Sequence, residues 1–234
     1  MRRPRKGIVW IITATCAGLL AGGAAWGGTI TGFQLLDSSN GSLSGNEISI
    51  ATGEANNDDF TGTGTDNPNR VTIEKAFTSI GYLDVMFSVQ DSDGVTEYFF
   101  SETVANQSGS PWTDYHIELW VYDSQGNLVP SSDFDFLDFN TGSSGADPDP
   151  VPTSGAFLDL THGGNEILWE NGELADAETA TFTFSIDVPD GVNAFVLRQR
   201  PSVTVVPEPA SMLLLGTGLA GLAGVLRKRR KSMG

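Results

Sequence analysis

The sequence predicts an all-β fold, an antiparallel β-sandwich of the immunoglobulin-like or jelly-roll type, flanked by an N-terminal signal helix and a C-terminal transmembrane helix. Two observations predict the sandwich. Short segments with period-two alternation of apolar and polar residues recur between residues 28 and 205. No helical amphipathic run of useful length appears in the same region. About eight to ten short strands separated by turn residues are typical of a sandwich.

The chain begins with an export signal. Four cations within the first six residues precede an uncharged, largely apolar stretch over residues 8–25. This order, followed by small residues, is what signal peptidase recognises, so we expect a signal peptide over residues 1–27 with Ala25 as a neighbouring cleavage site. The alternatives are a twin-arginine signal and lipidation at Cys16. The domain that follows, residues 28–205, is expected to be exported.

Alternation of side chains predicts the strands of this domain. The clearest run covers residues 180–188, where four apolar side chains point one way and polar side chains point the other. Residues 83–89 and 115–122 alternate in the same manner. Further strands are predicted at residues 71–77, 95–104, 134–139, 156–160, 167–169, 195–198 and 203–206.

Turn residues divide these runs. Asp91–Gly94 and Ser124–Asn127 each predict a hairpin, and the residues 189–191 end the longest strand. Residues 38–69 are rich in Gly, Asn, Asp, Ser and Thr, and residues 142–152 contain alternating prolines. Residues 38–69 are therefore expected to form a long loop or a ragged sheet edge, and residues 142–152 a second loop.

The central domain is strongly acidic. The whole chain has a formal net charge of −16, but between residues 28 and 206 only 4 Lys and Arg stand against 28 Asp and Glu, a net charge of −24. Binding to nucleic acid needs clustered cations, so nucleic acid is excluded as a partner. Acidity keeps an extracellular protein soluble, or it attracts divalent cations. Because the single cysteine lies in the signal, disulfides cannot stabilise the domain.

Most catalytic arrangements are missing from the sequence. The domain has no cysteine and the chain has two histidines, His116 and His162, which excludes Cys–His chemistry and disfavours a His-rich zinc site. No Gly-x-Ser-x-Gly motif marks a nucleophile, and the 28 carboxylates single out no pair for glycoside hydrolysis. We therefore expect a protein that is not an enzyme and has no catalytic residues.

Two candidate ligand sites follow from residue type. Asp91 and Asp93, in the pattern Asp-x-Asp-Gly, offer clustered oxygen ligands for Ca²⁺, although the glycine does not match an EF-hand loop. A hairpin tip is the alternative interpretation and is favoured over a calcium site. No other cofactor is expected. Trp120 lies on the polar side of its strand, where an indole can stack on a sugar ring. Packing against a loop or the second sheet is the alternative interpretation for Trp120.

The last 29 residues have three parts. Pro207, Glu208 and Pro209 form an extended, helix-incompatible segment. An uncharged run then reaches Leu226, and the 17 residues from Ala210 to Leu226 approach the minimum for a membrane-spanning helix. Five cations follow, namely Arg227, Lys228, Arg229, Arg230 and Lys231. A basic block of this kind stays on the cytoplasmic side, so the domain faces away from the cytoplasm.

This order of parts, over residues 206–231, resembles the PEP-CTERM sorting signal of Gram-negative bacteria. Residues 104–116 and 182–199 also resemble segments of the cargo domains that carry this signal. The resemblance implies processing by an exosortase after transient anchoring in the membrane, and delivery to the cell surface or secretion. Such cargo is associated with exopolysaccharide and biofilm. An ordinary membrane anchor with a chance proline pair is the alternative.

The combined prediction is an exported, non-catalytic surface or matrix protein of structural or interaction type. Signal peptidase, an exosortase-like enzyme, the membrane and exopolysaccharide are its expected partners. The alternative function is a lectin-like carbohydrate-binding module, assisted by calcium.

Overall fold

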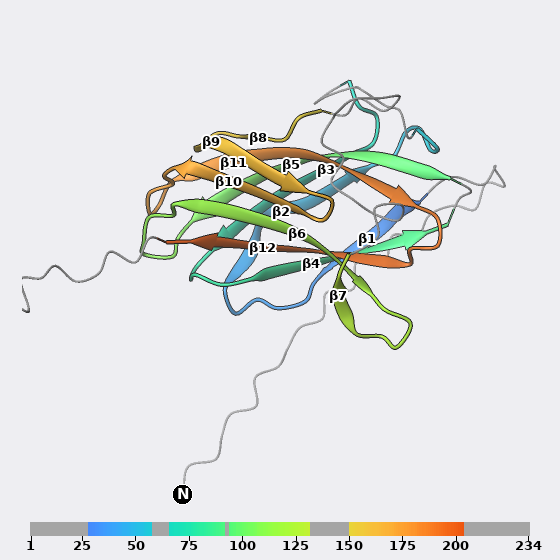
Figure 1. Ribbon diagram of the computed structural model, residues 1–234, viewed down its shortest axis with the longest axis horizontal. Coiled ribbons are helices and arrows are strands. Elements are labelled where there is room, and N and C mark those ends of the chain that lie inside the picture. Colours follow the sequence, from blue (N-terminus) through green and yellow to red (C-terminus); the bar gives the residue numbers. More distant parts are fainter. Residues whose placement is uncertain (1–27, 58–65, 92–93, 132–149, 204–234) are drawn as a thin grey trace, which may run out of the picture.

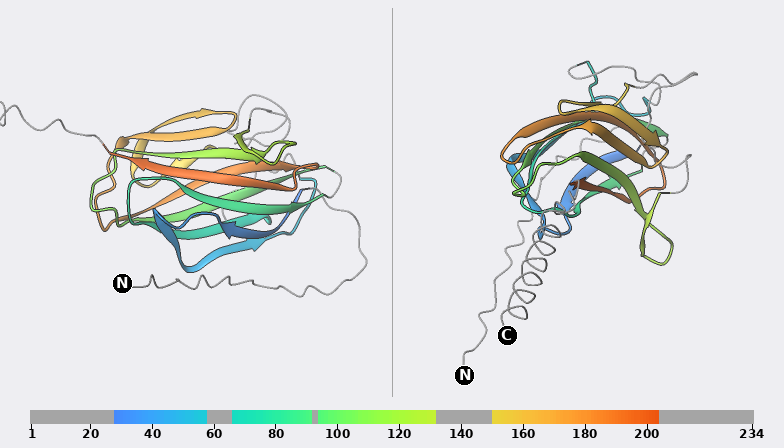
Figure 2. Two further views of the ribbon diagram at one scale, coloured as in Figure 1. Left: turned by 90° about the horizontal axis from the view of Figure 1, so that it is seen from below. Right: turned by 60° about the vertical axis from the view of Figure 1, so that its left-hand side comes forward.

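Two β-sheets packed face to face form the protein (Figures 1 and 2). The computed structural model describes residues 28–57, 66–91, 94–131 and 150–203. These residues contain strands and turns, which confirms the all-β prediction. No helix in this part of the chain is long and apolar enough to cross a membrane. The predicted signal helix and the predicted transmembrane helix both lie outside the described residues.

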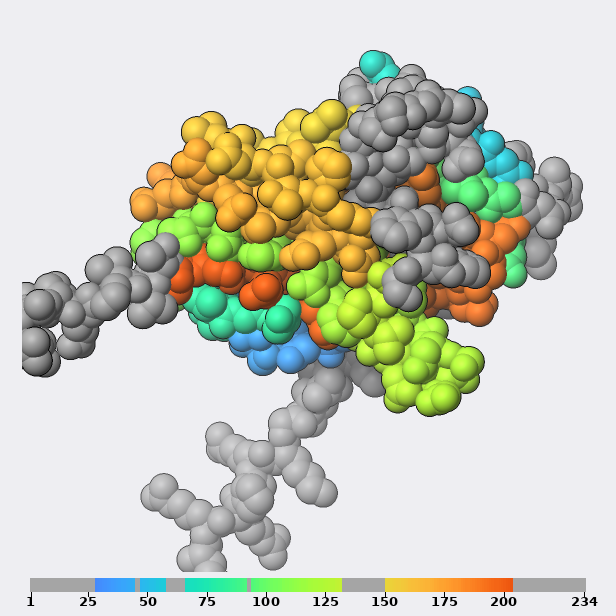
Figure 3. Space-filling model, in the orientation of Figure 1, coloured from blue at the N-terminus to red at the C-terminus, as the bar shows by residue number. Residues whose placement is uncertain are grey.

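One sheet has seven strands, and all its pairings are antiparallel. Across the sheet the order is β1 (Thr29–Leu35), β4 (Leu83–Gln90), β12 (Ala194–Ser202), β6 (Asp114–Tyr122), β10 (Glu166–Gly172) and β9 (Phe157–Gly163), with β7 (Leu128–Pro130) paired to β6. Figure 3 shows the outer surface of this sheet as successive bands, from blue β1 to yellow β9. Strand β12 therefore lies inside the sheet, between β4 and β6.

The second sheet has five strands. Its order is β2 (Gly41–Ala51), β3 (Arg70–Phe77), β5 (Val95–Asn106), β11 (Thr179–Pro189) and β8 (Thr153–Ser154). Strands β3 and β5 are parallel, which corrects the prediction of an entirely antiparallel sandwich. The reason is that β4, between them in the chain, belongs to the opposite sheet. The chain crosses the sandwich and returns, so β5 can start in the same direction as β3.

The predicted hairpin at Asp91–Gly94 is wrong. This segment joins β4 of one sheet to β5 of the other, so it connects the two layers. Turn residues indicate that the chain bends, but they do not indicate which sheet the next strand joins. The hairpin at Ser124–Asn127 is confirmed, because Tyr122 pairs with Leu128 across it.

Of the two alternatives for residues 38–69, the structure supports the ragged edge, because this segment contains β2. Strand β2 lies at the sheet edge and has a register shift between Leu43 and Ile48, beside Glu47 with a φ of 34°. Such an irregular edge strand needs few apolar residues, so it lacks the alternation that marks central strands. The predicted strand at residues 134–139 lies outside the described residues.

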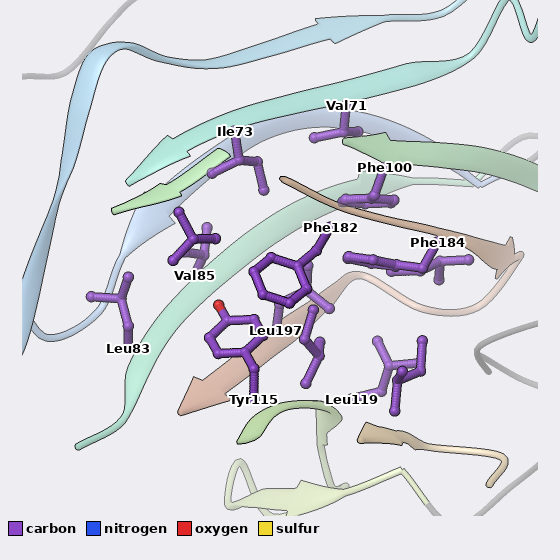
Figure 4. Close-up of a cluster of buried hydrophobic side chains, with 14 of the residues drawn as sticks. Val71, Ile73, Leu83, Val85, Phe100, Tyr115, Leu119, Phe182, Phe184 and Leu197 are labelled. Carbon is purple, nitrogen blue, oxygen red and sulfur yellow. The ribbon is translucent and has the colours of Figure 1, made fainter. Parts of the chain in front are cut away.

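An aromatic core fills the space between the sheets (Figure 4). The ring of Tyr115 lies 4.4 Å from that of Phe182, and the ring of Phe100 stacks 5.2 Å from that of Phe184. All four side chains are completely buried. Each buried aromatic or aliphatic side chain of this size stabilises the fold by about 1.5–3 kcal/mol, which explains how a cysteine-free domain stays folded.

Candidate functional site

Alternation along β12 places arginines on the outer surface of the seven-stranded sheet. Arg198 and Arg200 point outward, while Gln199 between them points into the sandwich and is completely buried. Neighbouring strands contribute aromatic and acidic side chains to the same surface. We call this group the outer patch, and its members are Tyr82, Asp84, Glu118, Trp120, Arg198 and Arg200.

Arg198 is the centre of the outer patch. Its guanidinium donates two hydrogen bonds to Asp84, at 3.0 and 2.7 Å, across the β4–β12 pair. It also lies 4.0 Å from the centre of the Trp120 ring and 5.1 Å from that of Tyr82. The hydrogen bonds with Asp84 raise the pKa of Arg198. The cation is therefore held both by a carboxylate and by two rings.

Trp120 is partly enclosed by these contacts. Its indole N–H donates to Glu118 at 2.8 Å, and Arg198 covers one face of its ring. The alternation-based placement of Trp120 on the polar side agrees with the structure, but its role in sugar stacking stays a prediction. Tyr82 is 45% exposed and offers more open aromatic surface. The sequence interpretation missed Tyr82 because it lies just before β4, outside any alternating run.

The region around Asp91 is built from the two connections between sheets. The carboxylate of Asp91 accepts a hydrogen bond from the backbone N–H of Gly191 at 2.8 Å. On the other connection, the carboxylate of Asp190 accepts a hydrogen bond from the backbone N–H of Gly94 at 2.7 Å. Asp93 lies outside the described residues. Among the residues that the structure describes, no three His, Cys, Asp or Glu side chains gather as metal ligands, so calcium at Asp91 and Asp93 stays a prediction.

A second polar group lies inside the sandwich. Lys75 of β3 forms an ion pair with Glu102 of β5, with Nζ and Oε2 2.7 Å apart, and also donates to Oε1 of Gln199 on β12. The amide nitrogen of Gln199 donates to the other oxygen of Glu102 at 2.7 Å. We call Lys75, Glu102 and Gln199 the interior cluster. It joins the two sheets, and each of its three residues is at most 1% exposed.

The sequence interpretation missed the interior cluster, although a signal was present. Lys75 has the same strand phase as Ile73 and Phe77, both of which are buried. Glu102 and Gln199 likewise occupy the inward phase of their strands. A charged or amide side chain at an inward position must find a polar partner, because an unpaired one is costly to bury. Three such positions in one domain predict a shared site.

Comparison with known families identifies the end of the chain. A family model described as the PEP-CTERM protein-sorting motif matches residues 205–230, which confirms the resemblance found in the sequence. The match includes Pro207, Glu208 and Pro209 and most of the basic block, all outside the described residues. No curated protein and no solved structure matches the chain. The motif indicates a protein that is exported and sorted to the surface or secreted by an exosortase-like enzyme.

Proposed function

We propose that the domain is a non-catalytic structural or interaction protein of the cell surface or extracellular matrix, associated with exopolysaccharide in a biofilm. One observation carries the proposal. Strand β12 ends at Ser202, and the sorting motif begins at residue 205. A central strand of the sandwich thus leads almost directly into the motif, so the sandwich is itself the cargo that is sorted.

The charge of the domain supports an extracellular role. With 28 acidic and 4 basic residues between residues 28 and 206, the domain repels other copies and other anionic surfaces. High net charge favours solubility at the concentrations of a secreted matrix. The arginines of the outer patch lie beside carboxylates, so they do not form a positively charged surface.

The proposed route has three steps. Signal peptidase removes residues 1–27, the apolar run over residues 210–226 holds the chain in the membrane for a time, and an exosortase-like enzyme acts at Pro207–Pro209. The basic block keeps the end of the chain on the cytoplasmic side during this time. Processing then separates the domain from its transient anchor.

Deletion of Pro207–Pro209 in the full chain tests this route. We expect the deleted protein to accumulate in the membrane fraction, while the wild-type protein is recovered at the surface or in the medium. Deletion of the last three residues, 232–234, removes the same length outside the matched motif and is the control. If the protein without Pro207–Pro209 is released like the wild type, the proposed processing site is wrong.

A lectin-like function is the second candidate, and the outer patch favours it. Tyr82 exposes an aromatic ring beside Arg198 and Arg200, and ring faces and guanidinium donors are the groups that hold sugars. Titration of exopolysaccharide from the native host into the purified protein, with and without calcium, tests this function. Tyr82→Ala should weaken binding at least several-fold. Leu158→Ala, a change at an 83% exposed side chain of β9, should leave binding unchanged. Absence of binding by the wild-type protein excludes the lectin function.

A further inference from the structure

The interior cluster has the components of a condensation reaction. It contains one primary amine on Lys75, one primary amide on Gln199 and one carboxyl group on Glu102. Glu102 contacts both of the others, through Oε2 to the amine and through Oε1 to the amide nitrogen, each at 2.7 Å. The amine contacts the amide oxygen, and the carbon bonded to that oxygen is the atom that an amine attacks.

The surroundings of Lys75 favour a nucleophilic amine. Burial lowers the pKa of Lys75 to about 8, although the carboxylate of Glu102 opposes this effect. The ring centre of Tyr115 lies 5.9 Å from Nζ, and its hydroxyl is 3.4 Å from Oε1 of Gln199. That hydroxyl can donate to the amide oxygen, which gains negative charge when the carbon is attacked. Water is excluded, because the side chains of Lys75 and Glu102 are completely buried.

We propose that Lys75 and Gln199 form an intramolecular isopeptide bond, with Glu102 transferring the protons. The bond between Nζ of Lys75 and Cδ of Gln199 forms, and the bond between Cδ and Nε2 of Gln199 breaks. Of the three Nζ protons, one stays on the new amide and two pass through Glu102 to Nε2. The nitrogen leaves as ammonium and Glu102 ends ionised, so the reaction needs no oxidant, reductant or other reactant.

The cross-link explains why such a cluster lies between these particular strands. It joins β3 of the five-stranded sheet to β12 of the seven-stranded sheet, across 124 positions of the sequence. A cysteine-free domain cannot make this connection with a disulfide. Strand β12 leads to the sorting motif, so a pull on that end of the chain would load the cross-link before the sheets separate. The cross-link involves the interior cluster alone and depends on no glycan ligand.

Peptide mapping of the wild-type full chain, purified in folded form and then denatured, tests the proposal. In a linear chain, a protease that cuts after Asp and Glu separates residues 75–84 from the C-terminal peptide that begins at residue 191. We expect these two peptides to be recovered as one branched product, lighter than their sum by one ammonia. Recovery of the two linear peptides from the folded protein would overturn the proposal. This result depends on no variant.

Amine labelling after denaturation gives a second readout. Lys75 is the only lysine between residues 28 and 206, so one side chain decides the outcome. We expect an amine-reactive reagent to leave Lys75 unlabelled. Complete labelling of Lys75 would show a free amine and refute the cross-link.

A pair of matched variants tests the role of Glu102. Glu102→Gln should abolish the branched peptide and restore labelling of Lys75, because the amide cannot accept the protons. Glu118→Gln changes a carboxylate on the outer patch in the same way and should retain the branched peptide. A branched peptide in Glu102→Gln at the wild-type yield would eliminate Glu102 as the proton carrier.

Discussion

Strand β12 presents two kinds of polar interaction on its two faces. Arg198 and Arg200 face water and lie beside carboxylates, whereas Gln199 faces the interior and joins an ion pair that water does not reach. Exposed ion pairs contribute little, because water and salt screen them. A buried pair has a large desolvation cost, and losing one partner leaves an uncompensated charge in the core. Burial, more than the presence of opposite charges, therefore decides how strongly the loss of one partner of an ion pair destabilises this protein.

The pKa values of Arg198 and Lys75 shift in opposite directions in these two environments. Hydrogen bonding to Asp84 raises the pKa of Arg198, while burial lowers the pKa of Lys75 to about 8. On the outer patch the dominant influence is the hydrogen-bonded partner. In the interior cluster the loss of water outweighs the partner. The outer patch is thus suited to binding through a stable charge, and the interior cluster is suited to chemistry through an amine that loses its proton.

The largest expected effect comes from breaking the interior cluster. Glu102→Leu should lower the free energy of unfolding by about 3–5 kcal/mol, because it leaves the amine of Lys75 sealed in the core without a carboxylate. Urea denaturation measures the change. Glu118→Leu, on the outer patch, is the matched control, and we expect about 1 kcal/mol or less. Equal effects of the two substitutions would contradict the distinction between the faces.

A smaller effect is expected from a buried hydroxyl that also joins the sheets. The hydroxyl of Tyr98 on β5 accepts a hydrogen bond from the N–H of Ile30 on β1 at 3.0 Å, and burial raises the pKa of Tyr98 to about 12. In the unfolded chain this hydroxyl ionises near pH 10, while in the folded chain it stays protonated. The contribution of the protonated Tyr98 hydroxyl to the free energy of unfolding is therefore complete below pH 10. It is lost as the pH rises from 10 to about 12.

Tyr98→Phe tests this expectation. Between pH 10 and 12 the free energy of unfolding should fall less in the variant than in the wild type, with a difference on the order of 2 kcal/mol. Denaturation at several pH values measures this difference. Tyr122→Phe removes a hydroxyl from a 42% exposed side chain and serves as the control. Parallel pH curves for wild type and Tyr98→Phe would show that Tyr98 has no such linkage.

The smallest effect is expected on the outer patch. Asp84→Asn removes the charge that faces Arg198 but keeps a hydrogen-bond acceptor, so we expect a loss of about 0.5–1 kcal/mol that shrinks with added salt. Denaturation at low and high salt measures it. A loss above about 2 kcal/mol that is insensitive to salt would mean that this pair behaves like a buried one.

The strongest strand predictions succeeded for a physical reason. Residues 83–89, 115–122 and 180–188 alternate because each of these strands has one face in the core and the other away from it. Edge strands such as β2 lack this contrast, so the sequence of residues 38–69 indicates only a loop or a ragged edge. The connection at Asp91–Gly94 was assigned to a hairpin because its turn residues are local, whereas the destination of β5 is set by distant strands.

The sequence by itself determined the central strands, their inward and outward positions and the sorting motif. These features depend on residues that are close together in the chain. Only the tertiary structure decided that Lys75, Glu102 and Gln199 meet, because three strands from two sheets must pack before the side chains come into contact. The sequence shows that each of the three points inward, and the packing of the sheets makes them one cluster.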